Sequence, residues 1–286
     1  MLTFDRNLEM HVSRVVEAFI GAGPIENSTL TLDGMGVNSA LQYKVLRRIG
    51  YENLLKLKSI NIVSGSTYAF ICFMAHHTGN LIPSARELEN WDTTHIRLSK
   101  IVPLWTGLKI GTNFITKTEK HSMPTENLSE VLKFLVTAEE YQAEFSRRYP
   151  NATLWFYDSV GKKIVNSKDD RLSTIKSFEA IQAATSVPGI FKKFHFNEMK
   201  LSDPVYSPQR SNLYRILKSV GTPHLISNPL RENQSNQTWY LRPHSHKNGK
   251  RLLTRDFIRY LMGFRNHEIN AAIKYGLFRS NEVGGI

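Results

Sequence analysis

The stretch INIVSGSTYAF, residues 60–70, is the feature that most restricts the fold of this chain. Its first four residues are almost wholly apolar, as a strand must be when both faces of its sheet are covered. A hydroxyl-rich turn follows, and the apolar pattern resumes at once as a buried helix. Thr29–Leu32 is a second short strand, and it leads through a glycine turn into another helical pattern. Strand, turn and helix in this order begin an α/β unit.

The same alternation continues along the chain and predicts the fold class. We expect an α/β fold with a mainly parallel central sheet and helices on both faces. All 286 residues are assigned to one domain, with a helical insertion or cap at 81–150 and a basic loop and C-terminal helix at 242–286. Further expected strands are 152–157, 200–203 and 224–227, and the expected helices are 8–20, 128–148, 177–184 and 212–220.

Charge and cysteine content restrict the setting of the protein. Lys and Arg outnumber Asp and Glu by 37 to 25, which leaves a net charge of +12 and favours anionic partners. The single cysteine, Cys72, excludes an internal disulfide and fits a reducing compartment. The charged N-terminal residues do not resemble a signal peptide, and no apolar run is long enough to span a bilayer. We therefore expect a cytoplasmic protein that can bind peripherally to a membrane.

The region Arg242–Arg265 concentrates positive charge near the C-terminus. Arginines, lysines and histidines alternate there with aromatic residues, first in a loop and then on a helix. Each basic residue near an anionic lipid surface contributes about 1 kcal/mol, so several together would anchor a protein reversibly. Nucleic acid is not expected as a partner, because the sequence lacks zinc-ligand spacing and RNA-binding signatures.

Three separate pieces carry side chains suited to chemistry. Asp33-Gly34-Met35-Gly36 lies at a strand-to-helix turn, where backbone amides of 34–36 can hold an oxyanion. Gly65–Ala69 follows a buried strand, where a sharp bend exposes one side chain at its apex. Asp203 ends a short strand and precedes a proline. A hydroxyl, a carboxylate and free amides are the groups needed for acyl transfer.

Taken in order, these pieces resemble the patatin-like phospholipase family. The matching segments are LTLDGMGVNSALQYKVLRRI, INIVSGSTYAF and, most specific, SFEAIQAATSVPGIFKKFHFNEMKLSDPVYSP. The resemblance implies a three-layer sandwich and a Ser/Asp dyad, in which Asp203 is the base and Gly34, Met35 and Gly36 form the oxyanion hole. It also implies phospholipids or other acyl lipids as substrates, with no metal or cofactor.

The sequence leaves the nucleophile open among three hydroxyls. Alignment on the family pattern Gly-x-Ser-x-Gly places Thr67 at the nucleophile position, while Ser66 lies one residue away and lacks the extra methyl group. These two rank equally, and Ser64 ranks third. The glycine loop also departs from the family pattern at Met35, and Pro204 follows the aspartate in place of a glycine.

Three functions follow from this combination of motifs. The first is a lipid acyl hydrolase with Ser66 or Thr67 as nucleophile and Asp203 as base. The second is an acyltransferase that uses the same site with an acceptor other than water. The third is a catalytically inactive lipid-binding protein, which the departures from the motif favour.

Overall fold

The computed structural model describes residues 6–34, 39–82, 122, 124–133, 135–227 and 237–241. Its centre is an eight-stranded sheet in which hydrogen-bonded pairs link β5-β6-β3-β2-β1-β7-β8 in that sequence, and β4 also pairs with β3. The strands β3, β2, β1, β7 and β8 are parallel, whereas β4 and β6 run antiparallel to β3. The bounds are β1 Thr29–Leu32, β2 Ser59–Val63, β3 Ala152–Asp158, β4 Lys163–Asn166, β5 Phe194–Phe196, β6 Met199–Ser202, β7 His224–Ser227 and β8 Thr238–Leu241.

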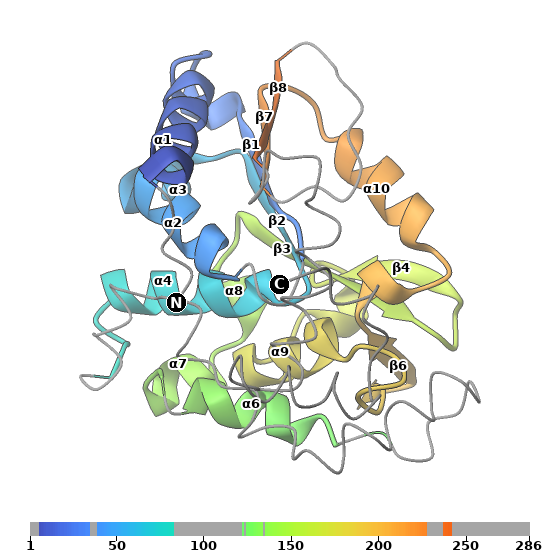
Figure 1. The fold of residues 1–286 in the computed structure, drawn as a ribbon. Helices are drawn as coiled ribbons and strands as arrows, with labels where there is room; N and C mark the ends of the chain where they lie inside the picture. The colour runs from blue at the N-terminus through green and yellow to red at the C-terminus, as the bar shows by residue number, and fades with distance from the viewer. Residues whose placement is uncertain are drawn as a thin grey trace, which may run out of the picture.

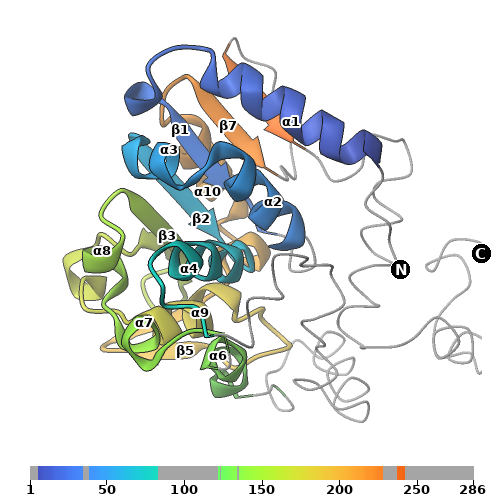
Figure 2. The same cartoon turned by 90° about the vertical axis from the view of Figure 1, so that its left-hand side faces the viewer.

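Helices lie on both faces of this sheet, which confirms the predicted mainly parallel α/β fold. One face carries α1 (Arg6–Ile20), α2 (Ser39–Ile49), α3 (Tyr51–Lys56), α4 (Ser66–His77) and α9 (Ser177–Thr185), and α10 (Arg210–Lys218) lies on the opposite side (Figure 1). Turned by 90°, the strands β7, β1, β2 and β3 lie side by side behind α2 and α4 (Figure 2). The three layers are therefore helix, sheet and helix.

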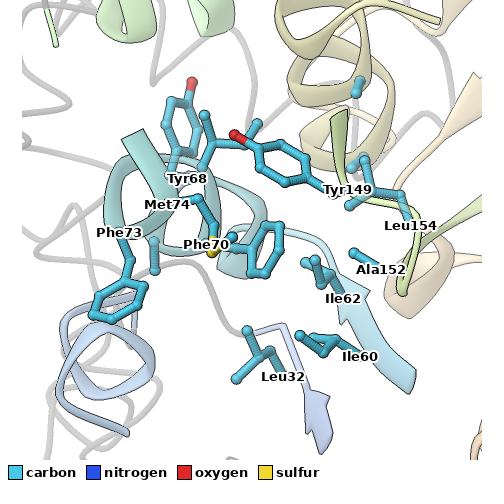
Figure 3. Close-up of a cluster of buried hydrophobic side chains, with 14 of the residues drawn as sticks. Leu32, Ile60, Ile62, Tyr68, Phe70, Phe73, Met74, Tyr149, Ala152 and Leu154 are labelled. Atoms are coloured by element: carbon cyan, nitrogen blue, oxygen red, sulfur yellow. The ribbon is translucent and has the colours of Figure 1, made fainter. Parts of the chain in front are cut away.

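The two faces of the sheet differ in chemistry. Leu32, Ile60, Ile62 and Leu154 lie on the face that packs against Phe70 of α4, where all five side chains are fully or almost fully buried (Figure 3). Each such large side chain stabilises the fold by about 1.5–3 kcal/mol through burial. This apolar face explains why a twelve-residue helix as hydrophobic as α4 forms the centre of its layer.

The opposite face is largely polar along its central strands. Thr31, Asn61 and Thr153 are paired in register on β1, β2 and β3, and all three are buried. The indole of Trp155 donates a 3.0 Å hydrogen bond to the side-chain oxygen of Asn61. A separate apolar cluster, which includes Val63, Trp155 and residues of α10, covers the carboxyl end of this face. The buried polar groups on this face therefore depend on internal hydrogen bonds.

Two strands meet end to end on one edge of β3. Both β4 and β6 pair with Tyr157 and Asp158, so they occupy opposite edges of β3, because a strand has only two edges. Trp155 pairs with both β4 and β2, so β2 lies on the edge that β6 also uses. Because β2 is parallel to β3 and β6 is antiparallel to it, the two strands run toward each other along this edge, and their carboxyl ends meet.

Several predicted elements are confirmed, and one is wrong. The expected strands and short helices correspond to β1, β2, β3, β6, β7, α1, α2, α4, α9 and α10. The long helix predicted over 128–148 is instead α6 (Glu126–Lys133), α7 (Ala138–Gln142) and α8 (Phe145–Arg148). Thr137 interrupts it, because its extended backbone and its hydroxyl, which accepts from the Glu140 amide, begin a new helix. The short strands β4, β5 and β8 were not predicted.

Parts of two predicted regions lie outside the described residues. In the expected insertion 81–150, the described helices α6 and α7 contact α9, but residues 83–121 are not described. The basic segment Arg242–Arg265 also lies outside the described residues, as does the rest of 242–286. Among the helices that are described, none combines the length and apolarity needed to cross a membrane.

His224 gives the polar face a dependence on pH that stability measurements can detect. Its ring nitrogen Nε2 lies 2.8 Å from the Thr31 hydroxyl, and burial lowers its pKa from 6.5 to about 4. As the pH falls, the unfolded chain therefore binds a proton at this histidine near pH 6.5, whereas the folded chain binds it only near pH 4. The free energy of unfolding therefore decreases as the pH falls across this window.

We expect wild type to lose about 3 kcal/mol of unfolding free energy relative to His224→Gln between pH 7 and pH 4. Urea denaturation at several pH values measures this difference. His195→Gln, at an exposed position on β5, is the matched control and should follow the wild-type curve. A constant difference between wild type and His224→Gln across the window would contradict the prediction.

Candidate active site

Ser64 occupies the bend between β2 and α4. It follows the last strand residue directly and has a φ of 56°, a region that few residues other than glycine adopt. Its side chain is buried, and its Oγ donates a hydrogen bond of 2.5 Å to Oδ2 of Asp203. Backbone strain of this kind is concentrated at functional sites, because surrounding structure must hold it in place.

Asp203 reaches Ser64 because of the end-to-end arrangement of β6 and β2. It is the first residue after β6, and its amide donates to the carbonyl of Ser186 at 3.0 Å. The other carboxylate oxygen, Oδ1, accepts from the Val205 amide at 2.9 Å. Pro204 begins a short 3-10 turn, at a position where no amide donor is needed. The proline that departs from the family pattern is therefore compatible with a well-held aspartate.

Burial sets the proton affinity of Asp203. The carboxyl group is inaccessible to solvent, and desolvation raises its pKa from 3.8 to about 7. The hydrogen bonds from Ser64 and Val205 oppose this rise, because they favour the ionised form. A carboxylate with a pKa near neutrality is suited to accept a proton and to return it in the same reaction cycle.

The glycine loop approaches Ser64 at Gly34. A Cβ atom at position 34 would lie 2.2 Å from Cβ of Ser64 and 2.6 Å from the carbonyl oxygen of Val63, so only glycine fits. The pairing of β1 with β2 causes this approach, since Leu32 and Ile62 are register partners at neighbouring strand ends. The predicted oxyanion loop and the bend at Ser64 are therefore in direct contact.

Asp33 holds this part of the loop in place. Its Oδ1 accepts hydrogen bonds from the Gly34 amide and from the hydroxyl of Tyr214 on α10, both at 2.8 Å. The side-chain amide of Gln42 on α2 donates to the Asp33 carbonyl at 2.7 Å. The Gly34 amide is thus used internally, and its predicted role as an oxyanion donor stays a prediction. Met35 and Gly36 lie outside the described residues.

The hydroxyls of Ser66 and Thr67 bond to backbone carbonyls and not to Asp203, so the geometry favours Ser64, which the sequence ranked third, as the partner of that carboxylate. The Ser66 Oγ lies 2.8 Å from the carbonyl of Leu32 and 2.6 Å from that of Val63, and it accepts from the Val63 amide. Thr67 donates to the Ser64 carbonyl at 2.7 Å. Hydroxyls in the first turn of a helix readily bond to nearby backbone in this way. Both side chains therefore stabilise the bend that presents Ser64.

The structure adds groups that the sequence did not single out. The amide of Gly65 follows Ser64 at the N-terminus of α4, where the helix dipole favours negative charge. Tyr214 contacts the glycine loop from α10, and no motif marks it. A hydroxyl directly after the last apolar strand residue, followed by glycine, is the signal that could have ranked Ser64 first.

Other buried ionisable groups belong to the scaffold. Glu140 is fully buried and accepts from Tyr149 and from Arg148, whose Nε lies 3.2 Å away. The described ranges contain no group of three or more His, Cys, Asp or Glu side chains arranged to hold a metal ion.

Replacement of Gly34 tests the close approach of the loop. Gly34→Ala should lower the free energy of unfolding by about 3 kcal/mol, because the methyl group would meet Val63 backbone and Ser64. Gly221→Ala is the control, since Gly221 has a φ of 91° but no atom within 4 Å of the added Cβ. It should cost about 1 kcal/mol from backbone strain alone. Equal losses for both variants in chemical denaturation would show that the loop does not pack against Ser64.

Comparison of the sequence with protein-family models and with curated proteins finds no match. The likeness to patatin-like phospholipases therefore stays a resemblance carried by motifs. The geometry of Ser64, Asp203 and Gly34 is independent of that resemblance, and it is what any functional proposal for this chain must use.

Proposed function

We propose that the protein is an acyl-ester hydrolase in which Ser64 is the nucleophile and Asp203 is the general base. The observation that carries the proposal is the 2.5 Å hydrogen bond from Ser64 Oγ to Asp203 Oδ2 in a buried site. A serine hydroxyl is a weak nucleophile unless an adjacent base removes its proton. Asp203 is in contact with that proton, and no imidazole is required between them.

The reaction has two halves that use the same pair of residues. Ser64 Oγ attacks the acyl carbon while its proton moves to Asp203, and the resulting tetrahedral intermediate collapses to acyl-Ser64 and an alcohol, which takes the proton from Asp203. Water then attacks the acyl-enzyme, with Asp203 again as base, and releases the carboxylic acid. Because the pKa of Asp203 is about 7, the base is ionised mainly above neutral pH.

Charge on the intermediate needs donors beside Ser64. The Gly65 amide at the start of α4 is our first candidate, because it follows the nucleophile directly and benefits from the helix dipole. The glycine loop is our second candidate, beyond Gly34, because the Gly34 amide already donates to Asp33. A pair of such donors supplies several kcal/mol of stabilisation of the transition state.

Lipids are the substrate class that the motif resemblance supports. The side chains of Ser64 and Asp203 are buried, so an ester must displace the cover over Ser64 to react. Two hollows on the described surface are lined by Pro208, Gln209 and neighbours on α10, and by Pro124, Lys192 and neighbours near β5. Neither hollow includes Ser64 or Asp203, so neither is assigned to the acyl chain.

A catalytically inactive lipid-binding protein is the second candidate. The observation that favours it is the hydrogen bond of the Gly34 amide to the Asp33 carboxylate, which occupies one expected oxyanion donor. An acyltransferase would use the same residues as the hydrolase, and only the acceptor of the acyl group would differ.

A fluorophosphonate probe tests the proposal. Incubation with the probe, followed by peptide mass spectrometry, should place the label on Ser64. Ser64→Ala and Asp203→Asn should each abolish labelling and hydrolysis of a fatty-acyl p-nitrophenyl ester. Ser66→Ala and Thr67→Val are matched controls, because each removes a buried hydroxyl within three residues of Ser64. They should keep the label on Ser64 and lose about 1 kcal/mol of stability.

Each other outcome selects a different account. A label on Ser66 or Thr67 would refute Ser64 as nucleophile. An absent label in folded wild-type protein, together with binding to acyl-lipid vesicles, would favour the inactive lipid-binding protein.

A further inference from the structure

The peptide unit between Asp33 and Gly34 is held at both of its ends. Its carbonyl oxygen, on Asp33, accepts a 2.7 Å hydrogen bond from the side-chain amide of Gln42. Its N–H, on Gly34, donates at 2.8 Å to Oδ1 of Asp33, and that oxygen also accepts from the hydroxyl of Tyr214 at 2.8 Å. A rotation of this peptide plane would break hydrogen bonds at both ends. The start of the glycine loop is therefore fixed in one orientation.

The two side chains that hold this peptide come from opposite layers of the fold. Gln42 lies on α2 and Tyr214 on α10, and the sheet separates these helices (Figure 1). Both side chains are buried, so water does not compete for their hydrogen bonds. Gln42 bonds to the carbonyl end of the peptide, and Tyr214 acts on the amide end through Asp33. The orientation of one peptide unit thus depends on two helices that the sheet keeps apart.

Gln42 also contacts the strand next to β1. Its Nε2 lies 3.3 Å from the carbonyl oxygen of Ser227, the last residue of β7, so one amide bridges the carboxyl ends of β1 and β7. The chain leaves β1 toward β2 and β3 on one side and returns to β7 on the other, so the strand order reverses between β1 and β7. Open α/β sheets form their ligand sites at the carboxyl ends of strands where the order reverses. Gln42 is therefore placed at the part of the sheet that is most suited to a site.

The two carbonyl acceptors set the orientation of the Gln42 amide. Only its nitrogen can donate to both, so Oε1 must point elsewhere, and Oε1 is buried without a hydrogen-bond partner in the described part of the chain. An unpaired buried acceptor is unfavourable for stability. Replacement of Gln42 by methionine removes this acceptor together with the donor, so we expect it to change global stability little. Gln42 therefore contributes more to the position of the loop than to the stability of the fold.

We propose that Gln42 and Tyr214 are positioning residues that together clamp the Asp33–Gly34 peptide and so set how fast Ser64 reacts. This inference rests on the proposed hydrolase function. The clamped peptide is in contact with the nucleophile, because a Cβ atom at Gly34 would lie 2.2 Å from that of Ser64. A displacement of about 1 Å in a site can lower a reaction rate by about a hundredfold. Both residues act through the loop.

A double-mutant cycle tests whether the two residues act on one peptide. The rate at which a fluorophosphonate probe labels Ser64 would be measured for wild type, Gln42→Met, Tyr214→Phe and the double variant. Gln182→Met is the matched control, because Gln182 is a buried glutamine on α9 that donates to Ser129 at 2.7 Å. Urea denaturation of each variant would establish that it is folded under the labelling conditions.

Each single variant of the clamp should label about tenfold more slowly than wild type or slower still, because one end of the peptide is then free to move. The double variant should be within about threefold of the slower single variant, since releasing the second end of a clamp adds little. Gln182→Met should label within about threefold of wild type, and its urea midpoint should be similar to that of Gln42→Met. A purely structural role would instead couple labelling to stability.

Hydrogen exchange measures the clamp without any reaction. In both single variants the Gly34 amide should exchange about tenfold faster than in wild type or faster still, as followed by NMR. The neighbouring Asp33 amide is the internal control, because it donates to the carbonyl of Ser227 at 3.0 Å and should keep its protection. Faster exchange of both amides would show that the end of β1 frays as a whole, which would contradict a clamp on one peptide.

The inference can fail separately from the proposed function. If wild type is labelled at Ser64 but the effects of Gln42→Met and Tyr214→Phe multiply in the double variant, the two residues act independently and there is no clamp. Single variants that label as fast as wild type, or equal slowing in Gln182→Met, would also overturn the inference. If wild type takes no label, the hydrolase proposal itself is refuted and the role of the clamp in the reaction falls with it.

Discussion

The hydrogen bond between Ser64 and Asp203 is the contact on which the site depends, and it follows from strand geometry. The strands β2 and β6 run toward each other along one edge of β3, so the residue after each strand arrives at the same place. Neither residue could be moved by one position without breaking the contact, because successive side chains of a strand alternate between faces. Two residues 139 positions apart in sequence are therefore brought together where two strand ends meet.

A buried carboxylate at this meeting point costs stability that the remaining fold must supply. Ionising Asp203 at neutral pH works against its burial, and Ser64 adopts a backbone angle that is unfavourable for serine. The apolar face of the sheet offsets these costs, since Phe70 and its neighbours are completely buried there. Tyr214 on α10 serves a different purpose: its hydroxyl donates to Asp33 and so holds the start of the glycine loop.

The sequence predicted the scaffold more completely than the site. Apolar strands such as Ile60–Val63 carry a local signal, and the order of the motifs was enough to predict Asp203 and the loop at Gly34 as site residues. The choice among Ser64, Ser66 and Thr67 depended on where β2 ends, which is a difference of one or two residues that local pattern does not resolve. Tyr214 could not be found, because its hydrogen bond to Asp33 joins residues 181 positions apart in sequence.

A direct titration of the Asp203 carboxyl group tests the central claim. Carbon-13 NMR of aspartate-labelled protein, with Asp203→Asn for assignment, would measure its pKa in wild type and in Ser64→Ala. Our account predicts a value near 7 in wild type and a higher one in Ser64→Ala, since the serine hydrogen bond lowers it. A value near 4 that does not change when Ser64 is replaced would contradict a buried Ser64–Asp203 pair.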